Sequence, residues 1–168
     1  VALCQDITVQ LDDADNTTIT PGDVDDGSND ACGLQGLSLD VDTFACDARG
    51  VNFVTLTVTD VNGNVKSCMA NVTVEDNVIP VAICPGNQTA DNDDTYCSAV
   101  VNGIGLTSAT DNCALTDTSY ALTGATTDSG SQASGSTFNV GITTVTYTIT
   151  DGSANTDACS FTVTVSDI

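Results

Sequence analysis

Hydrophobic and polar side chains alternate along residues 53–59, where Val54, Leu56 and Val58 share one face and threonines occupy the other. A period of two residues is typical of a β-strand with one buried face and one solvated face. Residues 68–74 show the same alternation, with a cysteine, an alanine and two valines directed inward. The two runs predict neighbouring strands of one sheet.

A short turn sequence separates these two runs. Residues 60–64 read Asp-Val-Asn-Gly-Asn, and Asn-Gly is a strong signal for a tight β-hairpin. The same arrangement recurs later, where the alternating residues 145–149 and 161–165 flank a turn at residues 151–155. No segment shows the 3.6-residue period of a helix. Many short strands with Gly, Asn and Asp turns predict an all-β fold of two tandem immunoglobulin-like β-sandwiches.

The two halves of the chain are repeats of each other. The chain opens with Val-Ala-Leu-Cys at residues 1–4, and Val-Ala-Ile-Cys recurs at residues 81–84. In both halves the aspartate after the threonine-rich strand lies eight residues before a cysteine, at positions 60 and 68 and at positions 151 and 159. Matching starts, ends and cysteine spacing predict two homologous domains, residues 1–78 and residues 79–168.

The phase of the repeats predicts an array. A linker at residues 75–80 joins the two halves, and residues 166–168 resemble the start of a second linker. A sequence that contains one linker and the start of the next is typical of one period of a longer head-to-tail array. A free two-domain protein, in contrast, needs residues that cap its terminal edges. We therefore expect the main partners to be neighbouring identical or homologous repeats.

Acidic side chains dominate the charge, with 23 Asp and Glu residues against two Lys and Arg residues and a formal net charge of −21. Nearly all are aspartates, which favour turns and loops. Phosphate contacts need Lys or Arg, so the composition excludes nucleic acid and anionic lipid as partners. No apolar segment approaches the ~20 residues of a membrane span, which argues against direct membrane insertion. The acidity serves either solubility in a secreted protein or the binding of divalent cations.

The eight cysteines predict disulfides. The sequence has no histidine and no CxxC pair, which argues against zinc, and widely spaced cysteines are typical of an oxidising, extracellular compartment. The first and last strands of an immunoglobulin-like sandwich can run parallel, which predicts two outer disulfides, Cys4–Cys68 and Cys84–Cys159. Elimination predicts two inner disulfides, Cys32–Cys46 and Cys97–Cys113. Each repeat would then hold two disulfides, and other connectivities stay open because sequence alone does not determine them.

Several of these features resemble the hyalin repeat (HYR) family. They are the opening cysteine, TDNC at residues 110–113, TVTYTITDGSAN at residues 144–155 and CSFTVTV at residues 159–165. The second repeat resembles the family almost throughout. The first resembles a variant common in large secreted proteins of Bacteroidetes-type bacteria, with DVDDGSNDACG at residues 23–33 among its marks. The resemblance implies an immunoglobulin-like fold, an extracellular location, and a role in adhesion or as a spacer in giant surface proteins, with no catalytic residue.

One loop concentrates carboxylates around Gly27. Its four aspartates are candidate calcium ligands: Asp23, Asp25, Asp26 and Asp30. Their spacing resembles the first half of an EF-hand loop, but Leu34 stands where a bidentate glutamate would close it, and a plain Asx-rich turn is the alternative. Asp76 in the linker is a further candidate, because a calcium ion bound there would stiffen the joint to a neighbouring repeat. Another acidic stretch is interpreted as a solvated turn: Asp91, Asp93 and Asp94.

Catalysis has little support in this sequence. There is no histidine to act as a base, the two basic residues stand alone, and the thiols are predicted to be oxidised. We expect a non-enzymatic repeat unit of a bacterial cell-surface adhesin stalk or extracellular filament, rigidified by disulfides and by any bound calcium. The alternative is a ligand-recognition module for a glycan or surface protein of a host or the environment, which an exposed cluster of aromatic residues would indicate.

Overall fold

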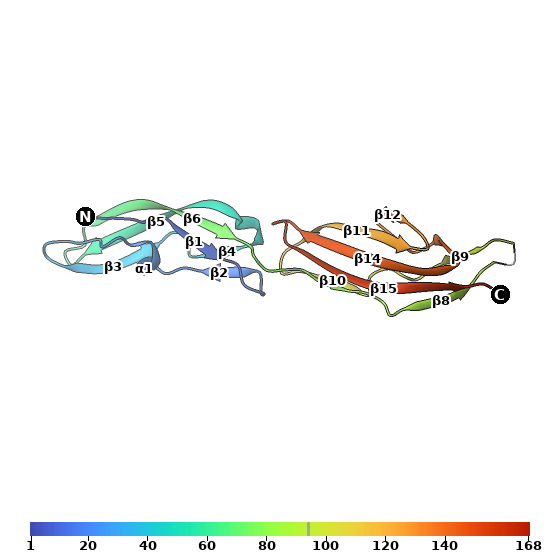
Figure 1. The fold of residues 1–168 in the computed structure, drawn as a ribbon. Helices are drawn as coiled ribbons and strands as arrows, with labels where there is room; N and C mark the ends of the chain where they lie inside the picture. The colour runs from blue at the N-terminus through green and yellow to red at the C-terminus, as the bar shows by residue number, and fades with distance from the viewer. Residues whose placement is uncertain (94) are drawn as a thin grey trace. The chain divides into compact units, whose positions relative to one another are not determined.

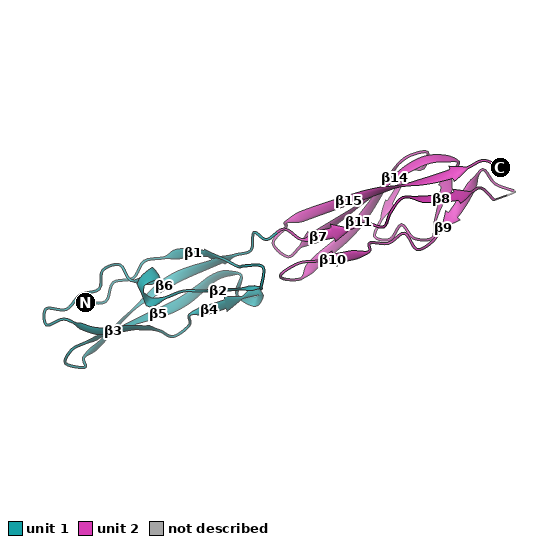
Figure 2. Ribbon diagram, turned by 90° about the horizontal axis from the view of Figure 1, so that it is seen from below, with its two compact units in different colours: residues 1–78 teal, residues 79–168 magenta. Residues whose placement is uncertain are grey.

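The computed structural model describes residues 1–93 and 95–168, so Asp94 lies outside the described residues. The chain divides into two compact units, residues 1–78 (unit 1, teal in Figure 2) and residues 79–168 (unit 2, magenta). In both, β-strands are the main secondary structure (Figure 1), which confirms the predicted all-β class.

Unit 1 combines a larger sheet with a pair of short strands. The larger sheet has the strand order β1-β6-β5-β3, with bounds β1 (Ile7–Gln10), β6 (Val65–Glu75), β5 (Gly50–Asp60) and β3 (Leu34–Leu39). The short strands are β2 (Asn16–Thr18) and β4 (Thr43–Ala45). The connections hold the helix α1 (Pro21–Val24) and the 3-10 turn η1 (Cys46–Ala48).

The long antiparallel hairpin of β5 and β6 is the centre of unit 1. On β5 the predicted inward residues Val54, Leu56 and Val58 are buried. On β6, Val72 and Val74 are buried beside them. Period-two alternation therefore places one face of this hairpin in the core, as the sequence predicts, because burying that apolar face drives the packing of the unit.

Unit 2 has a wider main sheet and two pairs of short strands. The main sheet has the order β12-β11-β14-β15-β8, with bounds β12 (Asp128–Gly130), β11 (Leu115–Gly124), β14 (Gly141–Asp151), β15 (Thr156–Ser166) and β8 (Gln88–Asp91). The first short pair is β7 (Val81–Ile83) with β10 (Ser108–Thr110). The second is β9 (Ser98–Val101) with β13 (Ser136–Asn139).

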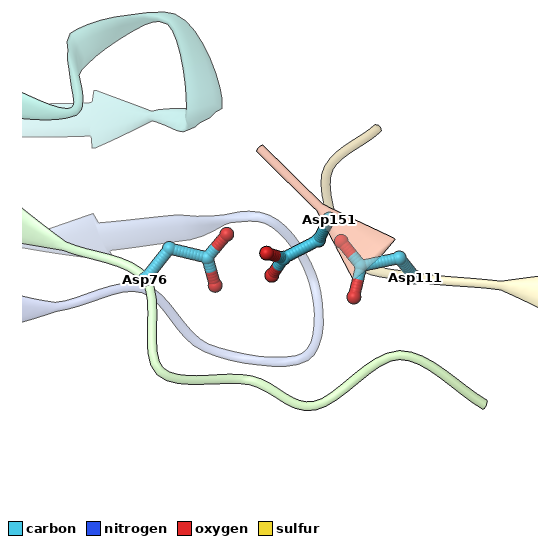
Figure 3. A group of neighbouring side chains, drawn as sticks. All are labelled: Asp76, Asp111 and Asp151. Carbon is cyan, nitrogen blue, oxygen red and sulfur yellow. The ribbon is translucent and has the colours of Figure 1, made fainter. Parts of the chain in front are cut away.

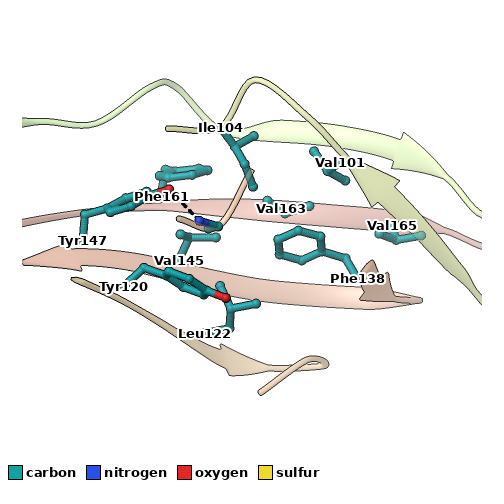
Figure 4. Close-up of a cluster of buried hydrophobic side chains, with 11 residues drawn as sticks. Val101, Ile104, Tyr120, Leu122, Phe138, Val145, Tyr147, Phe161, Val163 and Val165 are labelled. Atoms are coloured by element: carbon teal, nitrogen blue, oxygen red, sulfur yellow. Dashed lines mark hydrogen bonds between the residues drawn. The ribbon is translucent and has the colours of Figure 1, made fainter. Parts of the chain in front are cut away.

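The core of unit 2 is rich in aromatic side chains (Figure 4). Tyr147 and Phe161 of the main sheet share this core with Phe138 of β13. The Tyr147 hydroxyl accepts a hydrogen bond from the Ala133 amide at 3.1 Å and donates one to Gln132 Oε1 at 3.0 Å. This polar group is therefore satisfied inside an apolar environment, where an unpaired hydroxyl would cost stability.

In each unit an early strand runs parallel to the last strand. β1 pairs with β6, and β8 pairs with β15. Two disulfides close beside these pairs, Cys4–Cys68 and Cys84–Cys159, with Cα–Cα distances of 5.8 and 5.7 Å. Both predicted outer disulfides are thus confirmed. The parallel pairing of first and last strands on which they were based holds in unit 1, whereas in unit 2 the second strand, β8, is the one that runs parallel to the last.

The two predicted inner disulfides, Cys32–Cys46 and Cys97–Cys113, are wrong. Among the described residues, Cys32 and Cys97 are free and exposed. Cys46 and Cys113 are both disulfide-bonded. The prediction that each repeat holds two disulfides of its own is therefore wrong.

The length of the central strand explains the failure in unit 1. Cys32 lies beside the end of β5, because the neighbouring Gly33 carbonyl accepts a hydrogen bond from the Val61 amide. Cys46 lies in η1, shortly before β5 begins at Gly50. A strand of 11 residues spans roughly 33 Å, whereas a disulfide needs Cα atoms within about 7 Å.

The same separation holds in unit 2. The Cys97 carbonyl accepts a hydrogen bond from the Val140 amide, immediately before β14 begins. Cys113 lies two residues before Leu115, which pairs with Asp151 at the end of β14. Elimination failed because it took no account of the central strand, β14, whose length separates the two positions.

Candidate functional site

Each unit has two ends with different chemistry. The hairpin end carries the turn between the two longest strands, residues 60–64 in unit 1 and residues 151–155 in unit 2. The opposite end is where the central strand begins, at Gly50 of β5 and at Gly141 of β14. The acidic and cysteine side chains of interest lie at these ends.

One aspartate organises each hairpin turn. Asp60 Oδ1 accepts hydrogen bonds from the amides of Asn62 and Asn64, both at 2.8 Å, and Oδ2 accepts one from the Asn64 side chain at 2.8 Å. The bonds from Asn64, first its side chain and then its backbone, hold the pKa of Asp60 below the usual 3.8. Asp151 accepts the equivalent bonds from Ser153 and Asn155. The turn aspartates are thus structural residues in both repeats.

A second aspartate lies at the hairpin end of unit 2. Asp111 and Asp151 offer carboxylate oxygens within 4.8 Å of one another (Figure 3). Asp111 Oδ2 accepts a hydrogen bond from the Cys113 amide at 3.0 Å. In the described part of the chain, Asp111 Oδ1 is buried and accepts no hydrogen bond. Neighbouring carboxylates repel each other, and a hard divalent cation relieves that repulsion.

Unit 1 has the matching pair at its own hairpin end. Asp30 occupies the position of Asp111, and its Oδ1 accepts a hydrogen bond from the Cys32 amide at 2.9 Å. Asp30 and Asp60 both line a hollow of about 500 Å³. The same hollow also has an apolar part, which includes the side chains of Leu34, Val58 and Val65.

Among the four aspartates predicted from the loop at residues 23–30, the side chains of Asp23, Asp25 and Asp30 have local structural roles. Asp23 caps α1, accepting hydrogen bonds from the Thr20 amide and hydroxyl at 2.6 and 2.7 Å. Asp25 Oδ1 accepts one from the Ser28 amide at 3.0 Å. The Asp26 amide donates to the Leu3 carbonyl, and its side chain is exposed. Within the described residues these aspartates form no group of three close carboxylates, so their role as calcium ligands stays a prediction.

Asp76, also labelled in Figure 3, belongs to unit 1. Its Oδ2 is 3.5 Å from Arg49 Nη1, and its Oδ1 accepts a hydrogen bond from the Val78 amide at 3.3 Å. The carboxylate thus links the last residues of unit 1 to Arg49. Its predicted role as a calcium ligand also stays a prediction.

The opposite end of unit 2 has a hollow of its own. Its volume is about 630 Å³, and its lining includes Asp91, Asp93 and Tyr96. The Tyr96 side chain is 69% exposed, although tyrosine rings usually bury much of their surface. Cys97 follows it directly, so a free thiol and an uncovered aromatic ring lie together at this end.

Sequence reasoning did not single out Asp111 and Asp151 as a pair. Both residues stood in recognised sequences, TDNC and the TDGSAN turn, but the two sequences are separated by 40 positions. Antiparallel pairing of β11 with β14 brings them to one end of the sheet. The available signal was the repetition of Asp-x-Cys at residues 30–32 and 111–113 together with the turn aspartate.

Comparison with solved structures finds fibronectin(III)-like and cadherin modules of low sequence identity. The Clostridium thermocellum CbhA fibronectin(III)-like modules are 12% identical, with 98% of this chain and 91% of that chain covered and a TM-score of 0.40. Human mucin-like protocadherin EC1-2 is 14% identical, with 99% and 97% covered and a TM-score of 0.39. The protocadherin gamma B7 extracellular cadherin domains 1–4 are 13% identical, with 99% of this chain and 51% of that chain covered and a TM-score of 0.39.

Three further findings bear on identity. The comparison with curated proteins gives no match. No helix in the described residues is long and apolar enough to cross a bilayer. The sequence profile of the HYR domain matches residues 75–165, which is more than half of the chain and includes Asp111, Cys113 and the turn at residues 151–155. The chain therefore belongs to the HYR domain family, as the sequence resemblance predicts.

Proposed function

We propose that this chain is a non-enzymatic repeat unit of a bacterial cell-surface stalk or extracellular filament, assembled head to tail. Membership in the HYR family makes it an extracellular module of the adhesion type. One structural observation carries the step from module to repeat unit. In each unit the early strand and the last strand are parallel, β1 with β6 and β8 with β15.

Parallel pairing of an early strand with the last strand separates the point where the chain enters a unit from the point where it leaves. In unit 1 the Asn29 carbonyl accepts a hydrogen bond from the Val1 amino group, and the Val1 carbonyl accepts one from the Asn29 amide. Residue 1 therefore lies near the hairpin end of the unit. It leaves through Glu75 at the end of β6, which is the opposite end. A module with its two connections at opposite ends extends an array by its own length, whereas adjacent connections would fold the array back.

The disulfide positions fit a load-bearing role. Cys4–Cys68 and Cys84–Cys159 each tie the entering segment of a unit to the start of its last strand. Each closes a long chain loop, which destabilises the unfolded state by about 4 kcal/mol in the chain-entropy model. Many surface carboxylates and a net charge of −21 keep such modules soluble outside the cell.

Calcium is part of this proposal. Asp111 and Asp151 support it, because their oxygens lie close together and one of them accepts no hydrogen bond in the described residues. Asp23, Asp25, Asp26, Asp30 and Asp76 are the candidates from sequence. We expect calcium to raise the melting temperature of the wild-type chain relative to a chelator control, and Asp111→Asn to reduce that shift. An equal shift for wild-type and variant would exclude Asp111 as a ligand.

A ligand-recognition module is the alternative function. An exposed aromatic cluster would mark it, but among the described aromatics only Phe53 and Tyr96 are largely exposed, at 69% each, and they lie in different units. A glycan array on the purified chain separates the alternatives, because a specific hit favours recognition.

Electron microscopy of the purified, non-reduced chain over a range of concentrations tests the proposed function directly. We expect rods or fibres whose length grows by whole chains. Globular monomers at all concentrations would contradict the proposed function.

A further inference from the structure

The cysteines of each unit divide into three classes. Unit 1 contains the internal disulfide Cys4–Cys68, a disulfide-bonded Cys46 and a free, exposed Cys32. Unit 2 contains the internal disulfide Cys84–Cys159, a disulfide-bonded Cys113 and a free, exposed Cys97. Three quarters of the cysteines are therefore oxidised, which places the chain in a compartment where an exposed thiol also tends to become oxidised.

Each unit has one cysteine at its hairpin end and one at its opposite end, and the two units differ in which of them is free. Cys32 and Cys113 are equivalent, since each follows an aspartate by two residues, donates its amide to that carboxylate, and lies at the hairpin end. Cys46 and Cys97 share the opposite end, beside the start of the central strand. In unit 1 the hairpin-end cysteine is free, whereas in unit 2 the opposite-end cysteine is free.

Cys46, at the opposite end of unit 1, and Cys113, at the hairpin end of unit 2, are both disulfide-bonded. A cysteine at either position is therefore able to form a disulfide.

We propose that Cys97 of one chain and Cys32 of the next chain form an intermolecular disulfide, so that copies are joined covalently, opposite end to hairpin end. This inference rests on the proposed head-to-tail assembly and supplies its covalent chemistry. A bond between unlike positions is heterologous, and heterologous contacts that do not close into a ring build filaments. A free opposite-end thiol and a free hairpin-end thiol on every chain are what such growth requires.

The surfaces around the two thiols support contact with a second copy. At the opposite end of unit 2, the 69% exposed ring of Tyr96 adjoins Cys97. At the hairpin end of unit 1, Val1, Val61 and Val65 are 65%, 56% and 54% exposed. The Gly33 carbonyl, next to Cys32, binds the Val61 amide. Docking of one end on the other would remove this apolar surface from water.

The bond-forming chemistry balances through thiol–disulfide exchange with a disulfide oxidant, either a small-molecule disulfide or a protein disulfide oxidoreductase. The Cys97 thiolate attacks one sulfur of the oxidant, forms a mixed disulfide and releases the other sulfur as a thiol. The Cys32 thiolate of the next chain then attacks Cys97 Sγ and displaces the second thiol of the oxidant. Two protein thiols are oxidised, and one disulfide is reduced to two thiols.

Non-reducing gel electrophoresis of the purified chain, incubated with oxidised glutathione, tests this inference. We expect a ladder of dimers, trimers and longer species that collapses to monomer on reduction. Because the chain has two basic residues, cleavage at aspartate rather than with trypsin should release the linked peptides, and mass spectrometry should identify Cys97 joined to Cys32.

Two matched variants determine the direction of the bond. Cys32→Ser and Cys97→Ser each keep one free thiol, and both substitute an exposed cysteine, so circular dichroism should show unchanged folds. Neither variant alone should form the ladder, and an equimolar mixture should stop at the dimer. Dimers of a single variant joined through like cysteines, at wild-type yield, would overturn the inference in favour of a symmetric pair.

The remaining outcomes separate the inference from the proposed function. Rods that form in Cys32→Ser as readily as in wild type would overturn the disulfide and leave head-to-tail assembly intact. Wild-type chains that stay monomeric both on the gel and in the microscope would overturn both. A ladder with the Cys97–Cys32 peptide supports both.

Discussion

Unit 1 and unit 2 share one plan but differ in the size and chemistry of their cores. Unit 2 buries four aromatic side chains, Tyr120, Phe138, Tyr147 and Phe161, whereas Phe44 is the buried aromatic residue among the described part of unit 1. Unit 2 also extends its main sheet with β12. Small domains with thin cores depend more on covalent constraints, so unit 1 should rely more on its internal disulfide.

The disulfides provide the largest test of this comparison. Replacing both cysteines of Cys4–Cys68 or of Cys84–Cys159 with serine should cost each unit about 4 kcal/mol of unfolding free energy. We expect unit 1 to unfold at room temperature after this change and unit 2 to stay folded. All three tyrosines lie in unit 2, so near-ultraviolet circular dichroism follows that unit, and hydrogen exchange with mass spectrometry follows unit 1. Equal tolerance in the two units would contradict the comparison.

The second test uses a matched pair of core valines. Val54 on β5 and Val145 on β14 are equivalent, and both side chains are fully buried. Val54→Ala and Val145→Ala should each cost roughly 2 kcal/mol, from the lost methyl groups and the cavity left behind. Chemical denaturation measures the loss. A loss near zero in either unit would show that its core collapses around the smaller residue.

The hairpin turns provide a smaller test, in which matched substitutions should change the stability of the two units in opposite directions. Gly63 in unit 1 has φ of 82°, and Ala154 holds the same position in unit 2 with φ of 71°. A left-handed backbone costs a residue with a Cβ about 1 kcal/mol. Gly63→Ala should therefore destabilise unit 1 by about 1 kcal/mol, and Ala154→Gly should stabilise unit 2 by a similar amount. Thermal melting of the two variants checks the signs, and two changes of the same sign would exclude this explanation.

The smallest expected effect concerns acid. Asp6, before β1, accepts hydrogen bonds from the Asn71 amide and side chain, which lower its pKa below 3.8. A carboxyl with a lowered folded-state pKa contributes stability above its unfolded pKa, and that contribution is lost as the pH falls below 3.8. Asn87 occupies the equivalent position in unit 2 and has no ionisable group. Its Oδ1 accepts a hydrogen bond from the Thr162 amide at 2.9 Å. Asp6→Asn should make unit 1 less sensitive to pH between 4 and about 2, whereas an unchanged acid midpoint would exclude a role for Asp6.

Some features followed from local chemistry and others from pairing across the fold. Alternation at Val54, Leu56 and Val58 predicted a buried strand face because each side chain of a strand points opposite to the next. The outer disulfides were predictable because they depend on one parallel strand pair. Cys32 and Cys46 were assigned wrongly because their distance is set by the length of β5, which lies between them in space but not in sequence.

The sequence by itself determined the repeat, the β-class, the central hairpins and the family, because each depends on residue order over short distances or on matched motifs. Only the tertiary structure decided which cysteines remain free and which carboxylates gather at one end. Those results depend on the direction and length of strands that bring positions such as Asp111 and Asp151 together and keep Cys32 apart from Cys46. The physical reason is that an extended strand carries its two ends tens of ångströms apart, so each end has neighbours that are remote in sequence.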